Sequence, residues 1–191
     1  LRCLPNMVIM APKDENELAR MLETAIGHDG PVAVRYPRGI GEGVDIDPCP
    51  APIEIGKGQL SCKGDDLIIV ATGRSVIEAQ IAVDRLTEKG IQAALINARF
   101  VKPLDKELII EWVTKTKKVI TVEEHVLDGG FGSAVLEMLI DNDVTGYRVK
   151  RIGIRDTFVE HGSQAILRKD YSVDANAIVE AALAMQDQSG A

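Results

Sequence analysis

This sequence has few of the features that mark disulfide-rich, membrane-spanning or nucleic-acid-binding proteins. Its three cysteines, Cys3, Cys49 and Cys62, form no Cys-x-x-Cys pair, which argues against a disulfide framework and a structural zinc site. No apolar run approaches the roughly 20 residues that span a bilayer. The one lysine-rich stretch, at 115–118, is too short for a nucleic-acid stripe. We therefore expect a cytoplasmic protein that acts on small molecules, with no nucleic-acid partner and no membrane partner.

The sequence does contain enough apolar material for a folded core. Of its 191 residues 46% are hydrophobic, and the formal net charge is −7. This composition excludes disorder, and the length suits one domain plus a piece of another. The first four residues contain no starting methionine and run almost directly into strand-like sequence, so we expect a chain cut from a longer one.

The most informative local motif is Arg-Tyr-Pro-Arg-Gly at residues 35–39. It follows an apolar run typical of a short buried strand, which Pro37 should end because it has no amide N–H and a fixed φ. Arg38 then lies at a strand exit beside a glycine that lets a ligand come close. Its planar guanidinium suits a phosphate or carboxylate there. The alternative is that Arg35 and Arg38 are both solvated or paired with acidic neighbours.

The first part of the chain has the pattern strand, helix, strand. Residues 7–10 and 32–36 are the expected strands, and Asp14 with Glu17 forms a capping box at the start of the helix. Apolar residues at helical spacing define the expected buried face: Leu18, Met21, Leu22, Ala25 and Ile26. Two strands and one helix cannot make an independent core. We therefore interpret residues 1–43 as the end of a larger α/β domain.

A glycine- and proline-rich stretch without apolar periodicity separates this part from the rest. We interpret residues 44–52 as an interdomain linker that its prolines stiffen. In residues 53–188 strands alternate with helices, which predicts a mainly parallel, helix-covered sheet. The expected strands are residues 59–62, 67–71, 93–96, 119–122 and 149–154. The expected helices begin near Ser75 (a second capping box, with Glu78), Asp105, Ser133, Ser163 and Asp174.

Three loops of this second domain are expected at the carboxyl ends of the strands, where open parallel sheets bind ligands. Residues 72–75 could hold an anion at a helix N-terminus, or they are simply a glycine turn with a serine cap. Residues 128–133 match only part of a dinucleotide-binding fingerprint, and close helix–strand packing is the better explanation of their glycines. His161 beside Glu160 suggests acid–base chemistry, but a loop histidine bonded to the backbone is simpler. The three histidines lack metal-ligand spacing.

Seven motifs occur together in an order that resembles one family. They are residues 5–12 (PNMVIMAP), 14–17 (DENE), 33–39 (AVRYPRG), 99–105 (RFVKPLD), 122–124 (VEE), 129–133 (GGFGS) and 158–162 (FVEHG). Over nearly its whole length the chain resembles the C-terminal third of the 1-deoxy-D-xylulose-5-phosphate synthases, which are transketolase-like thiamine-diphosphate enzymes. The combination of residues 35–39 with residues 158–162 favours this family over other transketolase-like enzymes.

The resemblance implies a homodimeric enzyme that condenses pyruvate with glyceraldehyde 3-phosphate, with loss of CO2, in isoprenoid precursor biosynthesis. It also implies thiamine diphosphate and magnesium as cofactors. Residues 1–43 would end the pyrimidine-binding domain, and residues 53–188 would form the transketolase C-terminal domain. By family analogy Arg38 binds the phosphate of the aldehyde, and Arg35 is the candidate second contact.

The cofactor-binding part of the family pattern is absent from this sequence. The family holds diphosphate and magnesium with a Gly-Asp-Gly motif followed by an asparagine, whereas Lys63–Asp66 is only a turn. We therefore expect no catalytic, cofactor-binding or metal-binding residue in this chain, and no activity from the chain alone. The alternative is a non-catalytic dimerisation domain of another transketolase-like enzyme, such as a 2-oxo acid dehydrogenase β subunit.

Overall fold

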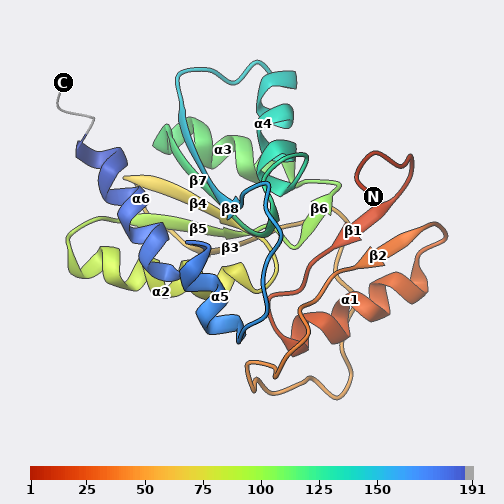
Figure 1. Cartoon of the computed structure of the whole chain (residues 1–191). Coiled ribbons are helices and arrows are strands. Elements are labelled where there is room, and N and C mark those ends of the chain that lie inside the picture. The colour runs from red at the N-terminus through yellow and green to blue at the C-terminus, as the bar shows by residue number, and fades with distance from the viewer. Residues whose placement is uncertain (188–191) are drawn as a thin grey trace.

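Two sheets organise the computed structural model of the chain, which describes residues 1–187 (Figure 1). The larger sheet has the strand order β3-β5-β4-β7-β8, in which only β3 is antiparallel to its neighbour. Its strands are β3 (Gln59–Cys62), β4 (Leu67–Ala71), β5 (Ala93–Asn97), β7 (Lys118–Val126) and β8 (Arg148–Ile154). The predicted mainly parallel α/β sheet is confirmed. The predicted domain end at residue 188 lies outside the described residues.

Helices cover both faces of the larger sheet. On one face α2 (Ser75–Glu88) and α6 (Ala175–Asp187) share an apolar core with β4, and on the other α3 (Lys106–Thr116) and α4 (Phe131–Asp141) share a second core. The central strand β4 is buried along its whole length, which explains why its sequence is continuously apolar rather than alternating. The short helix α5 (Gln164–Asp170) precedes α6. No helix among the described residues is long and apolar enough to cross a membrane.

The smaller sheet joins the two parts of the chain. Its central strand β1 (Val8–Met10) pairs in parallel with β2 (Val32–Val34) and antiparallel with β6 (Phe100–Lys102). Strand β6 lies beyond the linker and was not predicted from the sequence. Phe100 from β6 is fully buried in the same small core as Met10 and Met21. Residues on both sides of the linker therefore share one sheet and one core.

Helix α1 (Glu15–Gly27) begins as predicted but buries a different face. The Asp14 carboxylate accepts a hydrogen bond from the Glu17 amide at 2.7 Å, which confirms the N-cap. Leu22 and Ile26 are 46% and 82% exposed, so the predicted apolar face is wrong at these two positions. The buried residues of the helix are instead Glu17, Met21 and Thr24, and the Thr24 hydroxyl bonds to the backbone of Ile53, just after the linker.

The linker follows α1 in the same direction rather than crossing open solvent. One residue from nearly every turn of the helix bonds to the linker or to the residue on either side of it. These hydrogen bonds fix the path of the linker along α1. In order, they join Glu15 to the Gly43 amide, Asn16 to the Asp47 amide, Arg20 to the Ala51 carbonyl and Thr24 to the Ile53 amide, at 2.7, 2.9, 2.9 and 2.7 Å.

The predicted capping box of α2 is wrong. The N-cap is Arg74, which makes no side-chain capping bond, and the buried Ser75 hydroxyl has no partner among the described residues. Glu78 instead pairs with Arg74 at 2.6 Å and accepts a bond from the Ala175 amide at 3.1 Å. One competing partner of Glu78, Arg74, is four residues away in the sequence, and the other comes from α6, which a local pattern does not reveal.

A buried carboxylate connects α1 to the turn between β5 and β6. Glu17 is 3% exposed. Its oxygens accept bonds from Arg99 Nε at 2.7 Å, from Asn97 Nδ2 at 2.9 Å and from the Lys13 amide at 2.8 Å. These donors satisfy a charge that would otherwise be costly to bury, and they fix the smaller sheet against the larger one.

Replacing Glu17 should therefore destabilise the whole chain. We expect Glu17→Ala to lower the free energy of unfolding by about 3–5 kcal/mol, because it leaves the Arg99 guanidinium without its buried partner. Urea unfolding followed by circular dichroism measures this. Glu23→Ala, on the exposed side of the same helix, is the matched control and should change the free energy by less than about 0.5 kcal/mol. Equal effects of the two substitutions would contradict the role given to Glu17.

Candidate functional site

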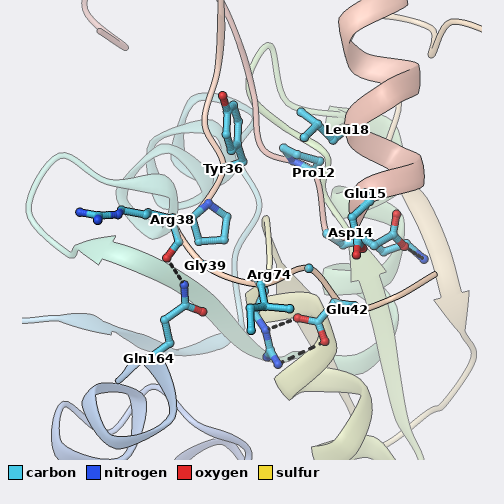
Figure 2. Close-up of a pocket in the computed structure, with 14 residues that line it drawn as sticks. Pro12, Asp14, Glu15, Leu18, Tyr36, Arg38, Gly39, Glu42, Arg74 and Gln164 are labelled. Carbon is cyan, nitrogen blue, oxygen red and sulfur yellow. Dashed lines mark hydrogen bonds and ion pairs between the residues drawn. The ribbon is translucent and has the colours of Figure 1, made fainter. Parts of the chain in front are cut away.

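The 35–39 segment leaves β2 and forms part of the wall of a cavity of about 490 Å³. Elements far apart in the sequence complete this wall (Figure 2). They are the loop before α1 with Asp14, the residues just before the linker with Glu42, the N-cap of α2 at Arg74, and Gln164 of α5. The predicted strand exit is confirmed, because β2 ends before Pro37.

Arg38 presents a guanidinium group to solvent at this cavity. Its side chain extends away from the Glu42–Arg74 ion pair (Figure 2). Within residues 1–187, no ion pair or hydrogen bond to the Arg38 guanidinium is present. Of the two forms of the alternative interpretation, the structure shows a solvated Arg38 and not one paired with an acidic neighbour. An exposed, unpaired guanidinium can grip a phosphate or carboxylate with parallel bonds.

Arg35 faces a different cavity. It lines a space of about 610 Å³ together with Thr72, Glu123 and His125. Its Nη2 donates to the Glu124 carbonyl at 2.5 Å. The structure therefore does not bring the Arg35 and Arg38 side chains together at one point.

The turn at residues 72–75 is a glycine turn and not an open anion site. Gly73 has a φ of +62°, which a glycine adopts without strain. The Arg74 guanidinium at this turn is already paired with two carboxylates, Glu42 at 2.7 Å and Glu78 at 2.6 Å. These carboxylates neutralise the charge that an incoming anion would need.

A carboxylate of the protein itself occupies the N-terminus of α4. Glu123 is 1% exposed and accepts bonds from the Phe131 and Gly132 amides at 2.7 and 2.8 Å. A Cβ at Gly130 would lie 2.3 Å from Glu123 Oε2 and 2.4 Å from the Val126 carbonyl. Close packing therefore explains Gly130, and also Gly132, where a Cβ would lie 2.6 Å from Thr121 Oγ1, whereas Gly129 is explained by its φ of +67°. The space that a dinucleotide phosphate would take at this helix is filled by Glu123.

The histidines do not converge on a common point. His125 is an exposed residue of β7, with Nδ1 3.1 Å from the Val126 carbonyl. The backbone bond expected for the loop histidine His161 is not seen within residues 1–187. His161 is exposed, and the Glu160 amide beside it donates to the Tyr171 hydroxyl at 3.1 Å. Among the described residues, no group of three or more His, Cys, Asp or Glu side chains is arranged to hold a metal ion.

Sequence reasoning missed the residues that contact the 35–39 segment from the larger domain. Gln164 Nε2 donates to the Arg38 carbonyl at 2.5 Å (Figure 2). Gln164 in turn contacts Arg168, which pairs with Glu124. The only local signal was the predicted helix start at Ser163, because nothing in the sequence places α5 beside residue 38.

The buried position of Glu123 gives a prediction for the pH dependence of stability. Burial raises the pKa of this carboxyl above its ordinary value of 4.5, against the two amide bonds that favour the charged form. The folded state therefore holds this proton more tightly than the unfolded state does, and the resulting stability is lost as pH rises through the raised pKa. We subtract the free energy of unfolding of Glu123→Gln from that of wild type, both measured by urea unfolding at several pH values. We expect this difference to become less favourable to wild type as pH rises above about 4.5.

Glu137 is the matched control for this experiment. The hydrogen bond from Arg2 lowers the pKa of Glu137, so its contribution to stability is present above 4.5 and is lost as pH falls through the lowered pKa. The difference between wild type and Glu137→Gln should therefore change with pH in the opposite direction. The same trend in both variants would contradict the assignment for Glu123.

Comparisons with known proteins agree with this architecture. The model of the transketolase C-terminal domain matches residues 56–178, and that of the transketolase pyrimidine-binding domain matches residues 1–42. A 1-deoxy-D-xylulose-5-phosphate synthase of Halothermothrix orenii is 54% identical over 188 residues, which are 98% of this chain and 30% of that protein. The 1-deoxy-D-xylulose-5-phosphate synthase 1 of Geobacter sulfurreducens is 54% identical over 191 residues, 100% of this chain and 30% of that protein.

A solved structure shows the same fold. A chain described as a split-gene transketolase, inactive beta4 tetramer, aligns with a TM-score of 0.82 and 30% identity over 95% of this chain and 58% of its own length. The resemblance seen in the sequence motifs is confirmed over nearly the whole chain. The chain spans about 30% of the length of the synthases that it matches.

Proposed function

This chain belongs to the transketolase family, and from that membership we propose that it is the C-terminal part of a 1-deoxy-D-xylulose-5-phosphate synthase. The complete protein would join pyruvate to glyceraldehyde 3-phosphate with loss of CO2, as a homodimer that works in the cytoplasm. The similarity to synthases over at least 98% of the chain supports this proposal.

The observation that supports a substrate role for this chain is the position of Arg38. Its guanidinium is exposed at the rim of a cavity and has no partner among residues 1–187, while the neighbouring cation Arg74 is paired with Glu42 and Glu78. A phosphate is the ligand that a planar guanidinium binds well. Arg38 would therefore bind the phosphate of the aldehyde substrate, a group that pyruvate lacks.

The cofactors would be held by the rest of the complete protein. Thiamine diphosphate supplies the carbanion chemistry of such enzymes when it is bound, and magnesium would hold its diphosphate. The residues of this chain do not fit that role, since the sequence has no Gly-Asp-Gly motif and the described part has no metal-binding cluster. The chain would contribute the substrate phosphate contact and the C-terminal domain.

The role of Arg38 is tested by steady-state kinetics of the complete synthase. We expect Arg38→Ala to raise the KM for glyceraldehyde 3-phosphate by about tenfold to a hundredfold, since a charge-assisted contact contributes about 1.5–3 kcal/mol. The KM for pyruvate should stay within about twofold of the wild-type value, because a threefold change would already correspond to about 0.6 kcal/mol. An unchanged KM for the aldehyde phosphate would overturn the assignment.

Two further variants make this experiment specific. Lys115→Ala removes one positive charge from α3, on the far face of the larger sheet, and should leave both KM values unchanged. Arg35→Ala tests which of the two cavities binds the phosphate, because Arg35 lines the second cavity and Arg38 the first. A large increase in the aldehyde KM with Arg35→Ala alone would move the phosphate site from Arg38 to the cavity of Arg35.

The separation of cofactor and substrate sites is tested with this chain alone. We expect isothermal titration of the 191-residue chain with thiamine diphosphate and magnesium to give no heat of specific binding, because the required donors are not in its sequence. Circular dichroism of the same sample checks that the chain is folded. Binding in the micromolar range would contradict the proposed division of the site.

A further inference from the structure

A circuit of four hydrogen bonds connects the two ends of the 35–39 segment through the larger domain. It passes from Arg35 to strand β7, then to helix α5, and returns to Arg38. The bonds are Arg35 Nη2 to the Glu124 carbonyl at 2.5 Å, Arg168 Nε to Glu124 Oε1 at 2.5 Å, Arg168 Nη2 to Gln164 Oε1 at 2.8 Å and Gln164 Nε2 to the Arg38 carbonyl at 2.5 Å. Every donor and acceptor in this circuit has the correct polarity.

The middle of the circuit is buried and its ends are exposed. Arg168 is 9% exposed, and its ion pair with Glu124 holds α5 against the end of β7. A small cavity of about 150 Å³, lined by Pro37, Glu124, Gln164 and Arg168, lies between this pair and the 35–39 segment. The segment therefore rests on a fixed ion pair rather than on mobile surface side chains.

Glycine 39 is the position that allows Gln164 to reach the backbone. A Cβ at Gly39 would lie 2.3 Å from Gln164 Nε2 and 3.0 Å from its Cδ. A methyl group there would displace the amide. The contact with Gln164, and not the backbone conformation, therefore favours glycine at position 39, because the φ of Gly39 is not in the left-handed region.

We propose that Gln164 is a positioning residue for Arg38: its amide fixes the Arg38 carbonyl, and Arg168 with Glu124 fixes that amide. The circuit holds the backbone of Arg38 while leaving its guanidinium available to the substrate phosphate. This deepens the proposed function and rests on it for the identity of the ligand. A held backbone lowers the entropy lost when the guanidinium binds an anion.

The kinetic test uses substitutions on one helix of the complete synthase. Gln164→Ala removes both the bond to the Arg38 carbonyl and the bond from Arg168. We expect it to raise the KM for glyceraldehyde 3-phosphate by about threefold to tenfold, the effect of losing the one hydrogen bond that holds the Arg38 backbone, with the KM for pyruvate unchanged. Gln164→Glu keeps an acceptor for Arg168 but loses the donor to the Arg38 carbonyl, so it should behave like Gln164→Ala. Ile166→Ala, at a 58% exposed position of the same helix, should leave both KM values unchanged.

The contact between Gln164 and the Arg38 carbonyl can also be disrupted by a substitution at Gly39. Gly39→Ala should raise the aldehyde KM to a similar extent, because the new methyl group displaces Gln164. The double variant Gly39→Ala with Gln164→Ala should then be no worse than either single variant, since one interaction is lost in all three. Additive effects would show that the two residues act independently and would overturn the proposal.

The third readout does not depend on activity. Arg38 and Gly39 are exposed, and trypsin should cut the bond between them faster when the backbone of this segment is held less firmly. Mass spectrometry should show faster cleavage at this bond in Gln164→Ala than in wild type or Ile166→Ala, with the urea midpoint unchanged. Equal cleavage rates would overturn the role of Gln164 in holding the segment.

The outcomes separate the two proposals. If Arg38→Ala raises the aldehyde KM and Gln164→Ala does not, the positioning role is wrong and the proposed function stands. If Arg38→Ala leaves this KM unchanged, the phosphate site is wrong, and with it the positioning of Arg38 for phosphate. The protease result then still decides whether Gln164 holds the backbone.

Discussion

The arrangement of this chain depends on one buried carboxylate. Glu17, on helix α1, accepts bonds from Asn97, the last residue of β5, and from Arg99, in the turn that leads to β6. A buried charge must keep its donors, because an unpaired one costs several kcal/mol. This constraint holds β6 beside β1, and β1 in turn positions β2 and the segment that follows it. The site at residues 35–39, which follows β2, therefore depends for its position on a contact that helix α1 makes elsewhere in the fold.

Around that site, most charged groups satisfy one another. Glu42 and Glu78 pair with Arg74, Glu124 pairs with Arg168, and Glu123 binds the amides at the start of α4. An acidic chain of net charge −7 can in this way offer one cation to an anionic ligand, because the surrounding carboxylates are already engaged. The effective charge of the site is set by which pairs form and not by the composition.

Much of the fold could be predicted because it depends on local signals. The apolar runs of β4 and β7, the cap at Asp14 and the end of β2 before Pro37 are read directly from neighbouring residues, although β2 ends at Val34, two residues earlier than predicted. The errors have a common cause. Strand β6 has only three residues, Glu78 is taken by Arg74 and α6 instead of Ser75, and Thr24 of α1 bonds to Ile53 just after the linker. Each outcome was decided at least in part by a partner distant in the sequence.

For the candidate site, the sequence alone determined the residue types and the backbone: two arginines around a proline, a strand that ends there, and a small residue beside Arg38. Only the tertiary structure decided that the two guanidinium groups line different cavities, and that Gln164 and Glu124, residues from distant parts of the chain, contact this segment. The physical reason is that φ restriction and side-chain chemistry are local properties. The pairing and orientation of charged groups depend instead on which surfaces the buried core brings together.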